Sequence, residues 1–452
     1  MGKLFGTDGI RGIVGENLTV ELAFHVGQAV AAVLTEEKGS KPTITIGKDT
    51  RISSDMLEAA LMAGICSVGG DVKPVGTIPT PAVAYLARQE GADAGIVLSA
   101  SHNPYEHNGI KVFSGQGYKL SDAVEARIEE KILSPEPMKL RTRGEIGRRY
   151  HGMRQLKRDY IDFVASTVES DLSGLRILVD CANGAASATA PELFGRFRAH
   201  TDFLHRDPDG VNINHHCGST HLEDLAQQVV RGGYDVGVAF DGDADRCLAV
   251  DENGSVVNGD KILYVCARNM QTEGRFGNSK VVTTVMSNLG LYKALDEAGI
   301  GYEKTDVGDK YVAENMRANG HLIGGEQSGH IIFGKYANTG DGLLTAIKLM
   351  QVMLDRKKTL SELAAPVREY PQQLTNVEVD DKDATLHDPA VVAAEQAVTE
   401  RLGDEGRILV RKSGTEPVLR VMVEAATHAL CEENVASVID AMQKSGHLIR
   451  VR

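Results

Sequence analysis

The sequence predicts an α/β protein with several sheet units, followed by a smaller α+β domain. Short β-branched runs alternate with helical patterns over most of the 452 residues, which is typical of parallel α/β layers. Three of these strands lead into polar loops, and open α/β sheets bind ligands at the carboxyl ends of strands. We therefore expect three α/β units facing one cleft. The tail has a different order of elements, which cannot continue a parallel series.

The strand segments are short, β-branched and bounded by turn residues, which is typical of buried strands. They cover residues 43–46, 95–98, 176–179, 236–240 and 280–284. Between the first two, residues 53–68 carry apolar side chains at helical spacing, from Met56 to Ile65. We predict a helix there, capped by Ser53 or Ser54.

From about Leu374 the pattern becomes strand, helix, strand, strand, helix. The predicted segments are 376–379, 388–401, 407–412, 418–425 and 432–442. The two central strands form a hairpin around 413–417, so we expect a separate, smaller domain. Pro366 and Pro371 mark the linker that precedes it.

Charge and composition exclude several classes of protein. The chain has 49 Lys and Arg against 62 Asp and Glu, a net charge of -13, which would repel a polyphosphate backbone. We expect no nucleic acid partner but a small, enclosed anion held by local cations and backbone N–H groups. The sequence contains no run of about 18 apolar residues, so we expect no membrane span. Six cysteines without a CxxC pair favour a reducing cytoplasm.

The segment Asp241-Gly-Asp-Ala-Asp-Arg246 carries the strongest chemical signal. Its three carboxylates at i, i+2 and i+4 follow a predicted strand, so they can turn together onto one hard cation, Mg²⁺ or Ca²⁺ rather than zinc. A calcium EF-hand is the nearest alternative, but Arg246 occupies the sixth loop position, where that turn needs glycine. Because Mg²⁺ keeps open positions for phosphate oxygens, we expect a phosphoryl group opposite.

Ser101 is the candidate carrier of that phosphoryl group. It lies just beyond the predicted strand 95–98, in Ala100-Ser-His-Asn-Pro104, where a short hydroxyl can project from a fixed loop. Taken alone, this fragment fits an Asn-Pro turn with a capping serine better than a catalytic one. A serine hydrolase is unsupported, because Ser101 does not lie in a Gly-x-Ser-x-Gly pattern.

Three further segments combine polar groups with glycine. Arg411-Lys-Ser-Gly-Thr-Glu-Pro417 has the cations and hydroxyls of a phosphate clamp, with Arg420 as the nearest further cation. Gly325-Glu-Gln-Ser-Gly-His330 suits the many hydrogen bonds of a hexose, and residues 5–12 present Arg11 from a glycine-rich loop. Each also fits a plain surface turn. We predict no zinc site, since no second ligand pair accompanies the residues His215, His216, Cys217 and His221.

Together, five of these motifs occur in the order seen in the α-D-phosphohexomutase superfamily, which the chain resembles over essentially its whole length. They are 5–12, 99–104, 241–246, 325–330 and 411–417. Five motifs are more specific than any one, and they reverse the preference for a capping role at Ser101. Within the superfamily the chain resembles the amino-sugar branch. Gly47-Lys-Asp-Thr-Arg51 fits that branch, and Gln327 stands where phosphomannomutase/phosphoglucomutase relatives tend to have Met.

The resemblance implies an α/β fold with three similar mixed-sheet domains and a smaller C-terminal α+β domain of TATA-binding-protein-like fold, around a central cleft. The predicted domains are residues 1–150 with the phosphoserine loop, 151–252 with the metal loop, 253–368 with the sugar-binding loop and 369–452 with the phosphate-binding loop.

The resemblance also implies a reaction, the reversible conversion of glucosamine 6-phosphate to glucosamine 1-phosphate on the route to UDP-N-acetylglucosamine. It runs through a phosphoserine and a sugar 1,6-bisphosphate that serves as intermediate and activator. One Mg²⁺ per chain is implied, with the ligands Ser101, Asp241, Asp243 and Asp245. The implied catalytic residues are Ser101, Arg11, His102, Lys111, Arg246 and His330. The implied substrate-binding residues are Glu326, Ser328, Arg411, Ser413, Gly414, Thr415 and Arg420.

Three alternatives remain at this point. A phosphomannomutase/phosphoglucomutase would carry the same kinds of motif, and Gln327 is the residue that favours the amino-sugar branch over it. A phosphatase with a phosphoserine intermediate would admit water and would not need the clamp at 411–415. A non-catalytic, phosphorylation-regulated binding protein would not need the triple-Asp loop. Also open are whether a kinase or autophosphorylation first loads Ser101, whether the chain forms a homodimer, and whether Lys111 or His330 moves the hydroxyl proton.

Overall fold

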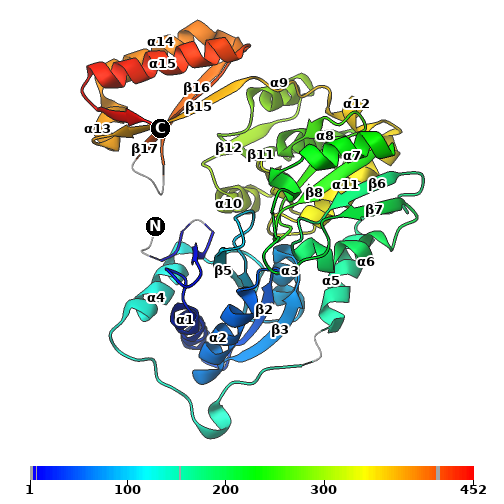
Figure 1. Ribbon diagram of the computed structural model, residues 1–452, viewed down its shortest axis with the longest axis vertical. Helices are drawn as coiled ribbons and strands as arrows, with labels where there is room; N and C mark the ends of the chain where they lie inside the picture. Colours follow the sequence, from blue (N-terminus) through cyan, green and yellow to red (C-terminus); the bar gives the residue numbers. More distant parts are fainter. Residues whose placement is uncertain (1–3, 7, 152–153, 414–417) are drawn as a thin grey trace. The chain divides into compact units, whose positions relative to one another are not determined.

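The computed structural model describes residues 4–6, 8–151, 154–413 and 418–452. Four sheets with accompanying helices make up this part of the chain (Figure 1). The chain divides into two compact units. The first comprises Met1–Met286 and Ile300–Ala365, and the second comprises Ser287–Gly299 and Pro366–Arg452. Among the described helices, none is both long and apolar enough to cross a membrane.

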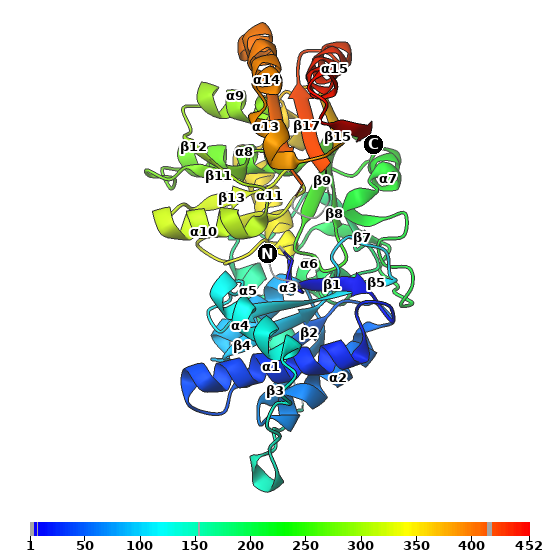
Figure 2. The same ribbon diagram turned by 90° about the vertical axis from the view of Figure 1, so that its left-hand side faces the viewer.

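The first sheet is mixed, in the order β1-β5-β4-β2-β3. β2 pairs in parallel with β3 and β4, whereas β5 runs antiparallel to β4 and β1. Its strands are β1 (Ile10–Ile13), β2 (Thr43–Lys48), β3 (Asp71–Thr77), β4 (Ala94–Leu98) and β5 (His107–Ser114). Its helices are α1 (Val20–Lys38), α2 (Ser54–Ser67), α3 (Thr80–Gln89) and α4 (Asp122–Leu133). Figure 2 shows α1 and α2 side by side against this sheet.

The second sheet has the order β10-β9-β8-β6-β7. β6 pairs in parallel with β7 and β8, and β9 runs antiparallel to β8. Its strands are β6 (Arg176–Asp180), β7 (His200–Leu204), β8 (Val236–Phe240), β9 (Cys247–Asp251) and β10 (Val256–Val257). Its helices are α5 (Arg154–Ser166), α6 (Ala190–Phe194) and α7 (Glu223–Gly232).

The third sheet has the order β12-β11-β13-β14, with β11 parallel to β12 and β13 and with β14 antiparallel to β13. Its strands are β11 (Val281–Thr284), β12 (Tyr302–Thr305), β13 (Ile323–Gly325) and β14 (Ile331–Phe333). The helices in this stretch are α8 (Gly259–Thr272), α9 (Leu289–Glu297), α10 (Asp309–Asn319), α11 (Gly342–Arg356) and α12 (Leu360–Ala364). Of these, α9 belongs to the second compact unit.

The first three sheets repeat one arrangement. In each, a central strand pairs in parallel with a strand on either side, and a later strand runs antiparallel to one of these two flanking strands. The connection into that antiparallel strand is the predicted functional loop in every case: β4 to β5, β8 to β9, and β13 to β14. This repeat confirms the expectation of three similar α/β domains.

The fourth sheet is antiparallel, in the order β16-β17-β15-β18. Its strands are β15 (Gln372–Val379), β16 (Arg407–Lys412), β17 (Val418–Glu424) and β18 (Leu448–Val451), with the helices α13 (Lys382–His387), α14 (Pro389–Leu402) and α15 (His428–Lys444). α14 and α15 bury the apolar face of the sheet, with Val377, Val421 and Val438 in the core. The smaller α+β domain is thereby confirmed.

Two details differ from the sequence prediction. Ser53 precedes α2 but makes no capping hydrogen bond through its side chain, and Ser54 donates to Asp49 instead. The prediction also missed α13 and β18. α13 has only six residues, and β18 is a largely exposed edge strand without a buried face, so neither carries a clear apolar period. The predicted domain boundaries at 150, 252 and 368 stay predictions.

Candidate active site

Ser101 lies in the connection from β4 to β5, where the backbone takes an unusual conformation. Its φ is 54°, in the left-handed region that residues other than glycine seldom occupy. The side chain is buried, and its Oγ donates a hydrogen bond of 2.5 Å to Asp241 Oδ2. Gly242 permits this approach, because a Cβ there would lie 2.5 Å from the Ser101 carbonyl oxygen. The turn therefore aims the hydroxyl at a carboxylate from the second sheet.

A buried ion pair supports this turn. Asp49 and Arg51 follow β2, and their side chains are fully buried, with 2.8 Å between Arg51 Nε and Asp49 Oδ2. The Arg51 guanidinium donates to the carbonyl oxygens of Ser101 and Asn103, each at 2.9 Å. Ser99 Oγ accepts from Ser101 N and donates to Asp49 Oδ2. These bonds satisfy the carbonyl groups of the turn and give the motif at 47–51 a positioning role that its sequence did not indicate.

The three aspartates lie between β8 and β9, two strands, which excludes the EF-hand alternative. Asp241, Asp243 and Asp245 are buried, and one carboxylate oxygen of each lies within 4.8 Å of the other two. Oδ1 of Asp243 and Oδ1 of Asp245 are buried with no hydrogen-bond partner in the described part of the chain. Unsatisfied buried acceptors are costly, and three hard oxygen donors suit Mg²⁺. The cluster could therefore hold a metal ion.

The three carboxylates of this cluster repel one another. Burial raises the pKa of the Asp241 carboxyl well above its usual value, and the neighbouring carboxylates Asp245 and Asp243 raise it further. Burial acts in the same direction on Asp245, but Lys111, His330 and Arg246 hold its pKa below the usual value. A cation bound among these carboxylates would relieve their repulsion.

Lys111, on β5, lies nearest to the aspartates among the predicted catalytic cations. Its Nζ is 2.7 Å from Asp243 Oδ2, 3.4 Å from Asp245 Oδ2 and 3.1 Å from Asp8 Oδ2. Burial opposes its charge, but Asp243, Asp8 and Asp245 raise its pKa well above the usual value. Lys111 is therefore an ammonium at neutral pH, which can neutralise charge but is a poor base.

His330 ends the connection from β13 to β14 and lies between two carboxylates. Its Nδ1 is 3.7 Å from Asp245 Oδ1, and its Nε2 is 3.5 Å from Asp309 Oδ2. Burial lowers its pKa, but Asp245, Asp309 and Glu326 outweigh burial and raise the pKa to about 9. Gly340 N donates to Nε2 at 2.9 Å, which favours the neutral ring with its proton on Nδ1. With these opposing influences, the ring can gain and release a proton.

Glu326 and Ser328 lie in the same loop. Burial raises the pKa of the Glu326 carboxyl, and its Oε1 accepts a hydrogen bond of 3.2 Å from Gly308 N. Ser328 Oγ is buried and has no partner among the residues that the structure describes. A carboxylate and an unused hydroxyl are suited to binding sugar hydroxyls.

A line of charges extends from Arg11 on β1 across the first and third sheets. Asp8 forms ion pairs with Arg11, Lys111 and Lys119, and Lys119 also pairs with Asp309 at 2.8 Å. Burial by itself would raise the pKa of the Asp8 carboxyl, but the charges of Lys111, Lys119 and Arg11 hold that pKa well below its usual value. Sequence reasoning missed three of these residues. Asp8 lies inside the motif at 5–12 and could have been singled out, whereas Lys119 and Asp309 lie outside every motif.

His102 and Arg246 complete the group near Ser101. Burial and the positive charges of Arg246 and Arg11 lower the pKa of His102 to about 4, so its ring is neutral at neutral pH. Its Nδ1 is 3.5 Å from Ser101 Oγ. Burial opposes the charge of Arg246, but Asp241 and Asp245 raise its pKa, and its Nε has no hydrogen-bond partner in the described residues. The guanidinium is thus available to an anion.

The predicted phosphate clamp belongs to the second unit. Arg411 on β16 and Arg420 on β17 are directly opposite each other in the strand pair. Burial and the charge of Arg420 lower the pKa of Arg411, as expected for two neighbouring cations. Ser413 is buried at the end of β16. Gly414 and Thr415 lie outside the described residues.

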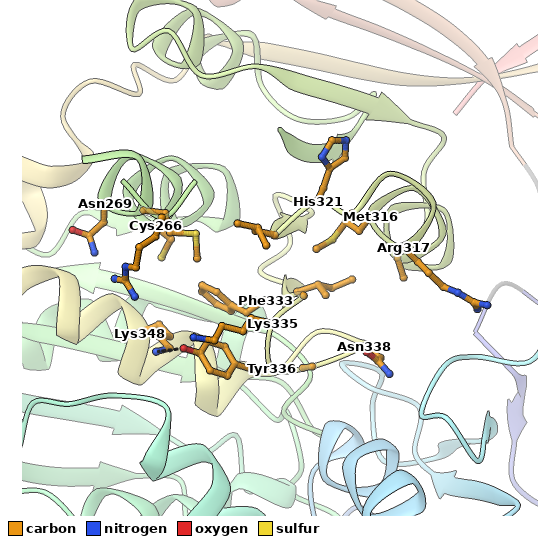
Figure 3. A pocket seen from close by; sticks show the side chains of 18 of the residues that line it. Cys266, Asn269, Met316, Arg317, His321, Phe333, Lys335, Tyr336, Asn338 and Lys348 are labelled. Carbon is orange, nitrogen blue, oxygen red and sulfur yellow. Dashed lines mark hydrogen bonds between the residues drawn. The ribbon is translucent and has the colours of Figure 1, made fainter. Parts of the chain in front are cut away.

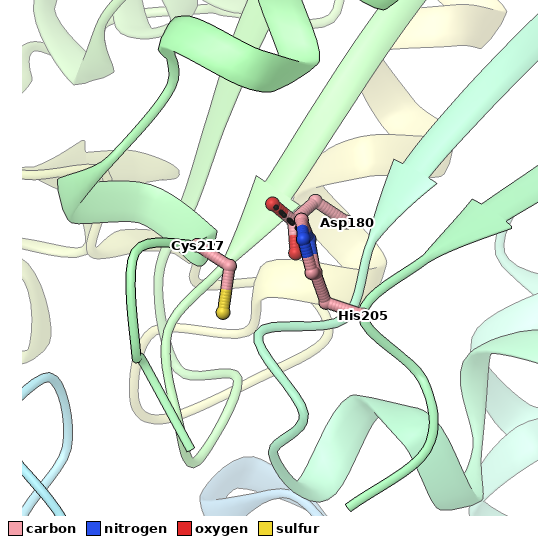
Figure 4. A group of neighbouring side chains, drawn as sticks. All are labelled: Asp180, His205 and Cys217. Atoms are coloured by element: carbon pink, nitrogen blue, oxygen red, sulfur yellow. Dashed lines mark ion pairs between the residues drawn. The ribbon is translucent and has the colours of Figure 1, made fainter. Parts of the chain in front are cut away.

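A second cluster with metal-ligating side chains joins Asp180, His205 and Cys217 (Figure 4). Asp180 ends β6, and both of its oxygens are engaged, Oδ1 by Ala182 N at 2.8 Å and Oδ2 by Gly218 N at 2.9 Å. His205 Nδ1 forms an ion pair with Asp180 Oδ2 at 3.1 Å. Burial and the charge of Asp180 raise the pKa of the Cys217 thiol to about 12, which disfavours the thiolate that metals bind. We interpret this cluster as a clamp that ties three loops together.

The arrangement of the chain matches a known family. Three family models, described as phosphoglucomutase/phosphomannomutase, alpha/beta/alpha domains I, II and III, match residues 2–138, 158–254 and 258–370. The model of the C-terminal domain of the same family matches residues 374–441. The chain belongs to the phosphoglucomutase/phosphomannomutase family. It is an enzyme of the isomerase class, as the sequence predicted.

Two curated relatives extend this result. A phosphoglucosamine mutase from Acetivibrio thermocellus is 50% identical over 447 residues, covering 98% of this chain and 99% of its own. A phosphoglucosamine mutase from Moorella thermoacetica is 54% identical over 424 residues, covering 94% and 95%. These relatives confirm the predicted resemblance to the amino-sugar branch.

Solved structures share the fold. A phosphoglucomutase/phosphomannomutase family protein from Burkholderia thailandensis has a TM-score of 0.80 at 22% identity, covering 99% of this chain and 98% of its own. An N-acetylphosphoglucosamine mutase from Aspergillus fumigatus, solved with GlcNAc-6P and magnesium, has a TM-score of 0.70 at 18% identity, covering 98% and 96%.

Proposed function

We propose that this chain interconverts glucosamine 6-phosphate and glucosamine 1-phosphate, with Ser101 as the phosphoryl carrier. The observation that supports the proposal most is the Ser101 hydroxyl, held in a left-handed turn and bonded to Asp241 at 2.5 Å. Backbone strain of this kind is typical of functional sites. The curated relatives named phosphoglucosamine mutase, about half identical over nearly the whole chain, support the amino sugar as substrate.

In this proposal one Mg²⁺ per chain is held by Asp241, Asp243 and Asp245, with the oxygen on Ser101 as a further ligand. When bound, the metal would offset negative charge on the phosphoryl group during transfer. The two orphaned aspartate oxygens support this assignment. Lys111 and Arg11 would neutralise the remaining charge of the site, and Arg246 would bind a phosphoryl oxygen through its unused Nε.

The first half of the reaction begins with phosphorylated Ser101. A sugar hydroxyl oxygen attacks phosphorus and forms a new P–O bond, while the bond from phosphorus to Ser101 Oγ breaks. His330, in the neutral form that accepts from Gly340 N, would take the proton of the attacking hydroxyl, and that proton would pass to Ser101 Oγ, so no net proton is consumed. Lys111 stays charged throughout, because its pKa lies well above its usual value. The product of this half is the sugar 1,6-bisphosphate.

The second half reverses these bonds at the other phosphate. The bisphosphate turns over, and Ser101 Oγ attacks the second phosphorus, which regenerates the phosphoserine and frees the hydroxyl of the product. Glu326 and Ser328 would hold sugar hydroxyls in both orientations. The phosphate that does not react would be gripped by the residues Arg411, Ser413, Gly414, Thr415 and Arg420. His102, neutral at pH 7, would donate a hydrogen bond to the phosphoryl group without adding charge.

Three further features complete the proposal. A sugar 1,6-bisphosphate acts as activator because it can reload Ser101 after the phosphoserine is lost. The first phosphoryl group comes from a kinase or from autophosphorylation. We also propose a cytoplasmic location, which the six free cysteines support, and a homodimer, which light scattering of the purified chain would test directly.

The deciding experiment combines an isomerisation assay with intact mass. The purified chain should isomerise glucosamine phosphate with a higher kcat/KM than glucose or mannose phosphate, and a fraction of chains should be heavier by one phosphoryl group. Ser101→Ala should remove that added mass, whereas Ser134→Ala, at the exposed end of α4, should keep it.

Other outcomes identify the alternatives. Faster turnover of glucose or mannose phosphate would move the chain to the sister branch and leave the role of Ser101 intact. Release of inorganic phosphate without isomerisation would indicate a phosphatase. Added mass on Ser101 with neither activity would indicate a binding protein.

A further inference from the structure

The first unit contains a large cavity away from Ser101 and the aspartates. It measures about 680 Å³ and is lined by α8, α10, the segment after β14 and α11 (Figure 3). That volume lies within the range of small-molecule sites. The lining includes none of the residues to which the proposed reaction assigns a role, so the cavity is a separate feature of the molecule.

The cavity is basic, although the chain is acidic. Four cations line it, namely Arg275, Arg317, Lys335 and Lys348, and none of its described lining residues is Asp or Glu. Arg275 has a carboxylate partner, Glu273, outside the lining. For the other three, the described part of the chain offers no ion pair. In a chain with a net charge of -13, such a local excess of cations favours an anionic ligand.

Lys348 is the most telling of these cations because it is buried on α11. Its Nζ hydrogen bonds only to neutral groups: the Thr167 carbonyl oxygen, Tyr336 Oη at 3.5 Å and Gln351 Oε1 at 3.4 Å. Burial lowers its pKa, and the nearby charge of Arg275 lowers it further. A buried ammonium without a carboxylate is costly, and an anion in the cavity would offset that cost.

The ammonium groups of Lys335 and Lys348 both lie beside the ring of Tyr336. Lys335 Nζ lies 5.3 Å from the centre of Tyr336, and Lys348 Nζ lies 4.5 Å from it. Arg317 lies over Tyr118, with its guanidinium carbon 4.8 Å from that ring centre. Figure 3 shows Lys335 and Lys348 together at Tyr336, with Arg317 at another side of the cavity. Lys335 and Lys348 therefore lie together at Tyr336, and the charge of Arg275 acts on Lys348, as a group with more than one negative charge requires.

The remaining lining distinguishes between classes of anion. Met316, Leu322 and Phe333 give the cavity an apolar wall, which a sugar phosphate with hydroxyls on every face would not use. The amides Asn269 and Gln351 also line it, and a fatty acid would have no use for these amides or for several cations. A nucleotide uses all three features, because it has a flat base with polar edges and a polyanionic end.

We propose that this cavity binds a nucleoside diphosphate, with the diphosphate at Lys335, Lys348 and Arg275 and the base against the wall of Met316, Leu322 and Phe333. The ligand would occupy a site distinct from the one that carries Ser101. The proposal does not depend on which sugar the chain isomerises.

The test is isothermal titration calorimetry on the full chain with ADP, CDP, GDP and UDP in separate titrations. At least one should bind at one site per chain with a Kd of about 100 µM or lower, and inorganic pyrophosphate should bind at least about tenfold more weakly, because it lacks the base. Saturating glucosamine 6-phosphate should change the Kd by less than about twofold, since the two sites are separate.

Variants assign the binding to the cavity. Lys335→Gln alters an exposed side chain and should weaken binding at least about fivefold while kcat/KM stays within about twofold. Lys358→Gln removes the same charge from an exposed residue that does not line the cavity and should leave the Kd unchanged. Three results would overturn the proposal: no binding of any of the four at 1 mM, equal binding of pyrophosphate, or binding that glucosamine 6-phosphate abolishes and Lys335→Gln does not affect.

Discussion

Two clusters of metal-ligating side chains lie at strand ends of the same sheet, and they differ in how their oxygens are occupied. The aspartates 241, 243 and 245 follow β8, and two of their buried oxygens have no partner in the described structure. Asp180, His205 and Cys217 gather at the ends of β6 and β7, and both oxygens of Asp180 accept backbone N–H groups. The carboxylates of the first cluster therefore keep oxygens without a partner among the described residues, whereas both oxygens of the Asp180 carboxylate are engaged.

The difference shows that residue type and proximity do not by themselves define a metal site. Carboxylate, imidazole and thiol groups all lie close together in the second cluster, yet its carboxylate already accepts two backbone N–H groups. The first cluster keeps three carboxylates together with unmet acceptors, which is unfavourable for stability and useful for binding a cation. A binding cluster and a structural cluster should therefore respond differently to substitution, to metal removal and to pH.

The largest effect is expected for the hydroxyl that faces the first cluster. Ser101→Ala should lower kcat at least about 1,000-fold with the fold intact, because the phosphoryl group loses its carrier. Cys217→Ser, an equally small change in the second cluster, should leave kcat within about twofold. Steady-state assays with circular dichroism as a folding control measure both. Near-normal turnover of Ser101→Ala, free of wild-type chain, would contradict the carrier role.

The next effect concerns the metal. Asp243→Asn should raise the Mg²⁺ concentration for half-maximal activity at least about tenfold, because it removes a charged hard ligand. Asp180→Asn should leave that concentration within about twofold. Electron paramagnetic resonance of bound Mn²⁺ provides a readout independent of turnover. Full activity of the wild-type chain in excess chelator would show that the first cluster is not a metal site.

The fold was largely predictable because its signals are local. The strands 43–46, 95–98 and 236–240 are short apolar runs between turn residues, and the structure places strands at all three. The repeat of the first three sheets was not visible as a sequence repeat. It resides in strand order and direction, such as the antiparallel return of β5, β9 and β14, and many different sequences satisfy that order.

The site was predictable where chemistry is concentrated in one segment, as in Asp241 to Arg246. It was less predictable where contacts join distant residues. Asp309 approaches Lys119 and His330 only because the first and third domains meet in the first unit, and no local pattern records that. The proton behaviour of Lys111 and His330 likewise depends on carboxylates brought together from several segments.

The two clusters should also differ in the sign of their effect on stability. Asp180→Asn should lower the melting temperature by a few degrees, because one oxygen must now serve two backbone N–H groups, a cost of about 1–3 kcal/mol. Asp241→Asn should raise the melting temperature in chelator. Its carboxyl has a raised pKa caused by burial and by two neighbouring carboxylates, so its charged form is unfavourable at pH 7. Calorimetry of both variants checks this. A fall for Asp241→Asn would contradict the view of the first cluster as a source of strain.

The smallest expected effect is a change in melting temperature with pH, and its direction distinguishes a structural second cluster from a metal site. The hydrogen bond with Asp180 raises the pKa of His205 above its usual value. A raised pKa in the folded state stabilises the protein fully below the unfolded value of about 6.5, and this stabilisation is lost as the pH rises through the folded value. The difference in melting temperature between the wild-type chain and His205→Gln, measured in chelator, should therefore be largest near about pH 6 and should shrink by about pH 9. A metal held by His205 and Cys217 would give the opposite slope, because it binds neutral imidazole and thiolate and gains affinity as the pH rises. A stabilisation that grows with pH and disappears in chelator would therefore make the second cluster a metal site.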